Sequence, residues 1–297
     1  MNACGYVMIR GLIPRHDLTK LALDITGILS EAGWLDSKSD PLERIPNLAT
    51  ACADGDRAYK TIRDRIFSLQ SFHELPHHPF LKQLMKLLVG EHLLVHPRPE
   101  LRLMFPNFDR GTIHAHQDHT AVAGDEESFT AWIPLSDCPI VEGPLRILAG
   151  SHRFGPQPTA GETGYIARGV EQGDGWVGGD INLGDILLFH SLTVHEALPN
   201  RSNQLRISLD FRFQSYDRAV NPAVFVFTGS GARTWENTYA NWTSSELKYY
   251  WTKLPLRFKP SMSELIELAQ SSTSSRLRER YARILQRLMS QPTGLTL

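Results

Sequence analysis

The stretch Leu205-Arg-Ile-Ser-Leu-Asp-Phe-Arg-Phe213 alternates strictly between apolar and polar side chains. Successive side chains of a β-strand point to opposite faces, so the alternation predicts a strand with one apolar and one polar face. The polar face carries two arginines, a hydroxyl and a carboxylate, from Arg206, Ser208, Asp210 and Arg212. Such a strand suits a barrel in which the apolar face packs on helices and the polar face lines the interior.

Four earlier segments have the short apolar runs and flanking turn residues that are typical of strands in an antiparallel sandwich or barrel. They are residues 101–105, 112–118, 129–135 and 185–194. Residues 198–203 are rich in turn formers and lie just before the alternating strand, so they predict a hairpin. The hairpin would bring His195, near the end of one strand, close to Arg206 on the next.

The chain on either side of these strands is mainly helical in pattern. Residues 5–12 predict a short strand, and helices are expected from Asp17 to before Gly33 and over residues 59–69, 79–89 and 262–288. The first helix has a stripe of apolar positions that suits burial, made of Leu21, Leu23, Ile25, Ile28 and Leu29. The aromatic residues from Trp235 to Trp251 are interpreted as core packing or an interface.

These patterns predict a mainly β protein with flanking helices, built as a double-stranded β-helix, or jelly-roll, barrel. We expect one domain over residues 1–297, with a helical part to about residue 92, a barrel core over about 93–216 and a helical extension over about 217–297. A hydrophobic fraction of 41% and a charged fraction of 21% agree with an ordinary globular core.

The charge balance excludes some classes of partner. With 31 basic and 32 acidic residues the net charge is -1, which leaves no electrostatic footprint for nucleic acid or for an anionic membrane. We expect a small-molecule substrate and a monomer or homodimer. Three widely spaced cysteines favour a reducing compartment, and neither a signal peptide nor a membrane-spanning apolar run is visible, so a cytoplasmic location is expected.

The sequence His116-Gln117-Asp118 is the first candidate for a metal site. If residues 112–118 form a strand, His116 and Asp118 project to the same face. With His195 as a third ligand, two imidazoles and one carboxylate leave three coordination positions open, as in non-haem Fe(II) oxygenases. His190 lies an odd number of residues before His195, so we expect it on the opposite face in a structural role.

An iron site also explains Arg206. A keto-diacid that chelates iron through its keto group and the adjacent carboxylate needs its distal carboxylate anchored. The planar fork of arginine binds a carboxylate through two hydrogen bonds, and Ser208, on the same face as Arg206, can donate another.

A zinc site is the main alternative. His114-Ala-His116-Gln-Asp118-His119 is the HxHxDH pattern of metallo-β-lactamase-type zinc hydrolases, and His152, Asp185 and His195 can complete a dinuclear site. In those enzymes a Gly-rich turn and a helix follow the motif, whereas residues 129–135 here predict a strand. The zinc scheme also gives Arg206 no role. A non-catalytic barrel that binds a small molecule is the third possibility.

The chain resembles the phytanoyl-CoA dioxygenase family of Fe(II)- and 2-oxoglutarate-dependent oxygenases. The segments that carry the resemblance are residues 116–118, 129–135, 150–152, 184–190 and 195–208. The resemblance implies that His116, Asp118 and His195 bind Fe(II) and that Arg206 holds the distal carboxylate of 2-oxoglutarate. It also implies contacts of Gln117 and Trp132 with this co-substrate, and Arg102, on the strand before the metal motif, is a further candidate.

Hydroxylation of an unactivated C–H bond, with O₂ as oxidant and release of succinate and CO₂, is the reaction that this resemblance implies. Halogenases of the family have a small residue in place of the carboxylate ligand, so Asp118 disfavours halogenation. Where many members have Gly-Gly, this chain has Glu142-Gly143-Pro144, and the shape of that loop is therefore open. The sequence does not identify the substrate.

Overall fold

The computed structural model describes residues 1–122, 124–160, 166–167, 175–227, 233–272 and 274–291. The larger of its sheets is antiparallel, in the order β1-β9-β4-β11-β2, with β3 also paired to β11. Its strands are β1 (Tyr6–Ile9), β2 (Leu93–Val95), β3 (Glu100–Met104), β4 (Ser128–Pro134), β9 (Ile186–His190) and β11 (Arg206–Ser215). The second sheet, in the order β10-β5-β8, contains β5 (Leu145–Leu148), β8 (Trp176–Val177) and β10 (His195–Ala197), while β6 (Thr159–Ala160) pairs with β7 (Ile166–Ala167).

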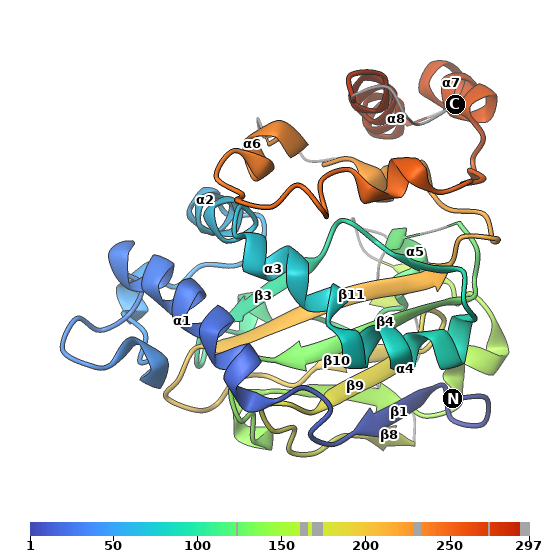
Figure 1. The fold of residues 1–297 in the computed structure, drawn as a ribbon. Helices are drawn as coiled ribbons and strands as arrows, with labels where there is room; N and C mark the ends of the chain where they lie inside the picture. The colour runs from blue at the N-terminus through green and yellow to red at the C-terminus, as the bar shows by residue number, and fades with distance from the viewer. Residues whose placement is uncertain (123, 161–165, 168–174, 228–232, 273, 292–297) are drawn as a thin grey trace.

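Helices cover one face of the larger sheet and one end of the molecule. In Figure 1, α1, α3 and α4 lie in front of the long strands β4 and β11, α7 and α8 lie side by side at the upper right, and α6 lies above α2 at the upper left. The α-helices are α1 (Arg15–Glu31), α2 (Arg57–Ile66), α3 (Gln70–Glu74), α4 (Pro79–Val89), α5 (Asp118–Val122), α6 (Trp235–Tyr239), α7 (Met262–Ser271) and α8 (Ser275–Met289). The 3-10 helices are η1 (Pro41–Glu43), η2 (Leu48–Thr50), η3 (Leu75–His77), η4 (Asp109–Gly111), η5 (Ile140–Glu142), η6 (Ser151–Phe154), η7 (Pro222–Phe225) and η8 (Tyr250–Lys253).

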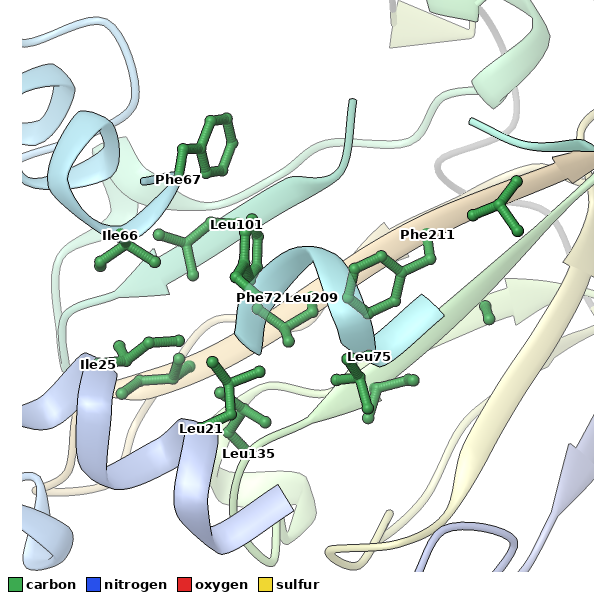
Figure 2. Close-up of a cluster of buried hydrophobic side chains, with 14 of the residues drawn as sticks. Leu21, Ile25, Ile66, Phe67, Phe72, Leu75, Leu101, Leu135, Leu209 and Phe211 are labelled. Atoms are coloured by element: carbon green, nitrogen blue, oxygen red, sulfur yellow. The ribbon is translucent and has the colours of Figure 1, made fainter. Parts of the chain in front are cut away.

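The alternation along β11 divides the molecule as the sequence predicted. Leu209 and Phe211, from the apolar face of this strand, pack with Leu21 and Ile25 of α1 and with Phe72 of α3 (Figure 2). Full burial of one such side chain stabilises a fold by about 1.5–3 kcal/mol. The helices therefore occupy the apolar face of the larger sheet, which leaves its polar face for the interior between the two sheets.

Two predicted strand features are wrong. Residues 112–118 do not form a strand: His116 makes an isolated bridge to His195, and Asp118 already begins α5. The hairpin over residues 198–203 does not form either, because β10 pairs with β5 whereas β11 pairs with β3 and β4. The segment instead crosses from one sheet to the other, so His195 and Arg206 belong to different sheets.

Three helix and boundary predictions also need correction. Leu23 is 51% exposed, because the buried stripe of α1 runs through Leu18, Leu21 and Ile25 instead. The single helix expected over 262–288 is two helices, and Ser274 caps the second through Leu277 N. The barrel is not confined to residues 93–216, since β1 extends the larger sheet beside β9.

The aromatic segment is core packing, as interpreted from the sequence. Trp235, Tyr239, Trp242 and Trp251 are all buried and their rings contact one another. Among the described helices, none combines the length and the apolar character that crossing a membrane requires.

Candidate active site

His116, Asp118 and His195 meet in the interior between the two sheets, where one possible ligand atom from each lies within 4.8 Å of the others. The two imidazole centroids are 4.2 Å apart, and His116 Nε2 is 3.9 Å from Asp118 Oδ1. In the part of the chain that the structure describes, this is the one group of three or more potential ligand side chains close enough to share an ion. The three residues predicted from the sequence are thus brought together.

The backbone brings them together by a route other than the predicted strand. His116 and His195 each donate their N–H to the other's carbonyl, at 3.0 Å in both directions. Asp118 follows as the first residue of α5, and His119 N donates to Ser191 O at 3.0 Å. The same-face placement of His116 and Asp118 therefore comes from a β-bridge followed by a helix start.

Both imidazoles are held in one tautomer. His116 Nδ1 is 2.8 Å from His114 O, and His195 Nδ1 is 2.9 Å from Thr193 O. A carbonyl oxygen only accepts, so each Nδ1 carries the hydrogen and each Nε2 keeps its lone pair for a metal. Burial, followed by the neighbouring His195, lowers the pKa of His116 to about 3, so the ring is neutral, as a metal ligand must be.

Asp118 is buried and ionised. Burial alone would raise its pKa, but the Arg212 guanidinium and then His195 outweigh this and hold the pKa of Asp118 far below its usual value. Arg212 Nε donates to Oδ2 at 3.1 Å and Nη2 to Oδ1 at 3.0 Å, and Thr130 Oγ1 donates to Oδ2 at 2.5 Å. The site predictions omitted Arg212 and Thr130, although the alternation along residues 205–213 already placed Arg212 on the same face as Arg206.

Arg206 is fully buried and only partly satisfied. Its Nη1 donates to Gly143 O, and its guanidinium lies 5.8 Å from the centroid of the Trp132 ring. Within the described part of the chain, Arg206 Nε and Nη2 have no hydrogen-bond partner, and neither do the buried Trp132 Nε1 and Ser208 Oγ. Burial lowers the pKa of Arg206 from its ordinary value.

The unpaired donors around Arg206 indicate what kind of ligand the site can bind. A buried cation without an anionic partner is costly, and unpaired buried donors cost about 1–3 kcal/mol each. A carboxylate beside Arg206 would satisfy two of its N–H groups at once. The donor set therefore fits the distal carboxylate of a keto-diacid, and the His-Asp-His donor set fits a ferrous ion.

One pocket connects the triad to Arg206. It is lined by residues of both sheets and of the segment before α5, namely Arg102, Ile113, His116, Asp118, Trp132, Leu145, His195, Arg206, Asp210 and Arg212. The polar face of β11 thus forms one wall, and β5 and β10 form the opposite wall.

Two of the predicted co-substrate residues are otherwise engaged. Gln117 does not line the pocket: its Nε2 donates to Leu192 O at 2.6 Å, and its Oε1 accepts from Gln157 N at 2.7 Å. Arg102 does line the pocket, but it pairs with Asp54 at 3.1 Å and with Asp210 at 3.6 Å. Gln117 therefore ties two loops together beside the triad.

The zinc scheme is not assembled among the described residues. His114 is exposed, His152 Nε2 is 3.2 Å from Asn2 O, and Asp185 Oδ2 accepts from Arg10 at 2.5 Å. None of these three joins the metal-ligand cluster. His190 has the structural role expected for it, since its Nδ1 accepts from Leu192 N at 3.1 Å.

The Glu142-Gly143-Pro144 loop supports Arg206 directly. Gly143 has φ +78, and a Cβ at this position would lie 2.2 Å from Leu198 O, so the loop needs glycine here. Glu142 pairs with Arg44 at 3.0 Å, and the Gly143 carbonyl accepts from Arg206. The departure from the family pattern therefore leaves the arginine site intact.

Comparison with known proteins agrees with this site. The family model described as Phytanoyl-CoA dioxygenase (PhyH) matches residues 1–208, most of the chain. The chain belongs to the phytanoyl-CoA dioxygenase family. Membership confirms the predicted enzyme class, a dioxygenase that uses Fe(II), 2-oxoglutarate and O₂, and it disfavours the zinc hydrolase and the non-catalytic barrel.

Relatives in the phytanoyl-CoA dioxygenase family include two 1-deoxypentalenic acid 11-beta-hydroxylases. Those of Streptomyces arenae and Streptomyces exfoliatus are 28% and 25% identical over 230 residues, which is 71% of this chain and 77% of theirs. Among solved structures, the epimerase SnoN in complex with Fe3+, alpha ketoglutarate and nogalamycin RO is 21% identical, with a TM-score of 0.55 over 78% of this chain and 88% of its own. The apo non-heme monooxygenase ThoJ is 16% identical, with a TM-score of 0.57 over 98% of both chains. These structures share the fold, which confirms the predicted fold class.

Proposed function

We propose that this member of the phytanoyl-CoA dioxygenase family hydroxylates an unactivated C–H bond of a small molecule and converts 2-oxoglutarate to succinate and CO₂. One observation supports this above all. A His-Asp-His cluster and a buried guanidinium with two unpaired nitrogens line the same pocket. A ferrous ion and a keto-diacid need these two features together.

His116, Asp118 and His195 are the proposed iron ligands. When bound, iron and 2-oxoglutarate supply the oxidising power that activates O₂ for attack on a C–H bond. The protein holds the ligands: the His114 and Thr193 carbonyls orient the two imidazoles, and the ionised Asp118 contributes one negative charge.

Arg206 is the proposed anchor for the distal carboxylate of 2-oxoglutarate. Trp132, which lines the pocket, and Ser208, which does not, each have a buried donor without a partner among the described residues, and both are proposed to add hydrogen bonds to the co-substrate. Arg102 is a second cation at the pocket wall, but its ion pairs with Asp54 and Asp210 make it a weaker candidate for this contact. The burial of Arg206 excludes water, which strengthens each of these contacts.

Hydroxylation is proposed because the two curated relatives are named as hydroxylases. SnoN, named as an epimerase, shares the fold, so the fold does not fix the outcome. The position of the substrate C–H relative to the metal decides it. The wall of the pocket has both signs of charge, with Arg102 and Arg212 beside Asp118 and Asp210, and by itself does not select one substrate class.

The test starts with the purified protein under anaerobic conditions. Addition of Fe(II) and 2-oxoglutarate should give the weak visible charge-transfer band of the chelate, and admission of air should then produce succinate. Asp118→Ala is the matched control and should give neither signal. If wild-type protein gives no band and instead cleaves esters or lactams in the presence of zinc, the proposal is wrong.

A further inference from the structure

The Asp118 carboxylate accepts three hydrogen bonds from residues that the structure describes. Arg212 donates one to each oxygen, from Nη2 to Oδ1 at 3.0 Å and from Nε to Oδ2 at 3.1 Å. Thr130 Oγ1 donates a second hydrogen bond to Oδ2, at 2.5 Å. All three residues are buried, so these contacts form out of reach of solvent.

The two oxygens of Asp118 are therefore not equivalent. An ionised carboxylate offers about two lone pairs on each oxygen. Among the described residues, Arg212 and Thr130 donate to Oδ2 and occupy both of its directions, whereas Arg212 alone donates to Oδ1 and occupies one. Oδ1 is also the oxygen that faces the triad, at 3.9 Å from His116 Nε2.

We propose that Arg212 and Thr130 are positioning residues that restrict Asp118 to binding the metal through Oδ1 alone. This inference rests on the proposed function, because it takes Asp118 as an iron ligand. A carboxylate that bound through both oxygens would take a fourth coordination position. Held to one oxygen, the triad would leave three positions on a bound metal, enough for a chelating keto-diacid and O₂.

The geometry of the larger sheet fixes the two positioning residues. Arg212 and Thr130 are directly opposite each other in the pairing of β11 with β4, so both side chains reach Asp118 from one cross-strand pair. Arg212 Nη1 is also 4.0 Å from Glu100 Oε1 on β3, and Glu100 is 3.9 Å from Arg98. Arg98 Nη1 in turn donates to Ala223 O and Val226 O, at 3.2 and 2.9 Å. These contacts connect the charged side chains to η7 and to Val226, which caps its C-terminal end.

Arg212 also balances charge. Asp118 is buried and pairs with Arg212 at 3.0 Å, and a buried charge is costly unless it is paired. Within the described residues, Arg212 Nη2 is the one hydrogen-bond donor to Oδ1, so this oxygen keeps a lone pair for a metal. The carboxylate is therefore oriented before any metal arrives.

The experiment compares metal binding by folded variants rather than turnover. Thr130→Val removes the hydroxyl at nearly constant volume, Thr130→Ser retains it, and Arg212→Met removes the fork. Co(II) affinity is measured by its visible absorption. Nitric oxide, which occupies the position of O₂, is then added anaerobically with Fe(II) and 2-oxoglutarate, and its paramagnetic adduct is counted per bound iron. Thr26→Val is the matched control, since Thr26 is a buried threonine of α1 that donates to Ala22 O.

We expect Arg212→Met to lose about 10- to 100-fold in Co(II) affinity, as is typical when a residue that supports a metal ligand is removed. Thr130→Val should bind Co(II) more weakly or form fewer than half the nitric oxide adducts of wild type, and Thr130→Ser should recover both. If Thr130→Val and any folded Arg212→Met protein match wild type in both measurements, the positioning role is wrong. A wild-type protein that binds no Co(II) would instead contradict the proposed function.

Discussion

His116 and His195 are joined by two reciprocal backbone hydrogen bonds of 3.0 Å, although they are far apart in the sequence. The bridge fixes the distance between the two imidazoles through the backbone. Carbonyl contacts at each Nδ1 then fix the rotation of the rings. Two ligands of the candidate iron site are thus preformed, and metal binding should require little backbone movement.

Loss of any one ligand should abolish the reaction. We expect His195→Ala and Asp118→Ala to form no succinate above background, because two remaining ligands cannot hold iron in the required geometry. Succinate formation and bound Fe(II) per chain are the measurements. His190→Gln is the control, because a glutamine can still accept from Leu192 N and His190 lies outside the cluster. Equal iron content in His195→Ala and wild type would contradict the assignment of this ligand.

Arg206→Met should weaken the binding of 2-oxoglutarate without lowering the stability of the fold. Hydrogen bonds to charged groups contribute about 1.5–3 kcal/mol, so the KM for 2-oxoglutarate should rise by about 10- to 150-fold. In the absence of 2-oxoglutarate the variant should be at least as stable as wild type, because it removes a buried charge that has no anionic partner among the described residues. Urea unfolding and succinate assays measure the two effects. A KM that does not change would exclude Arg206 as the anchor.

Gly143→Ala should weaken both the fold and the arginine site. The added Cβ would lie 2.2 Å from Leu198 O and 2.9 Å from Pro199 C, at φ +78. We expect a loss of more than about 2 kcal/mol in the free energy of unfolding and a higher KM for 2-oxoglutarate. Gly33→Ala is the control: Gly33 has φ +72 but no atom within 4 Å of its Cβ position, so only about 1 kcal/mol of backbone strain is expected. Equal losses in the two variants would contradict the close approach at Gly143.

Acid should destabilise the fold through three histidines, of which His73 and His96 are buried and His77 is partly buried. Burial lowers the pKa of His73, His77 and His96 to about 4. The unfolded chain binds protons at these histidines near pH 6.5, whereas the folded chain does not until about pH 4. Their contribution to stability is therefore complete above pH 6.5 and is lost as the pH falls from 6.5 toward 4, by about 1.4 kcal/mol per pH unit for each histidine.

Urea unfolding between pH 7 and pH 5 measures this loss. His77→Phe is the informative variant, since His77 packs edge-on against Tyr250 at 4.8 Å and a phenyl ring can keep that contact. With one titrating group removed, the slope of unfolding free energy against pH should fall by up to about 1.4 kcal/mol per pH unit, which is the share of one histidine. A wild-type stability that is flat across this range would contradict the low pKa values.

The sequence predicted which residues gather at the site better than it predicted the backbone path that brings them together. The alternation along β11 was strong because every position from Leu205 to Phe213 obeys it, and the structure confirms both faces. The strand predicted over residues 112–118 was wrong, since this segment forms a β-bridge followed by the start of a helix. That backbone turns the side chains of His116 and Asp118 to the same side, as a strand would. Local pattern alone does not distinguish these two backbones.

The missed features depend on contacts between segments distant in the sequence. The turn formers before β11 predict a reversal of the chain, but whether the two strands then pair or separate into two sheets depends on β3, β4 and β5. Thr130 reads as an ordinary strand residue until β4 is placed opposite Arg212. The exposure of Leu23 likewise depends on which side of α1 meets the larger sheet, because the apolar pattern there is wider than the buried face.

The incomplete pairing of Arg206 has a consequence for feedback. In its proposed role, this arginine would hold the carboxylate of the co-substrate that the reaction leaves unchanged, so its contacts would not distinguish 2-oxoglutarate from succinate. Succinate should therefore compete with 2-oxoglutarate for Arg206 and inhibit the enzyme as it accumulates. Release of the spent diacid then becomes a candidate for the slow step of each cycle.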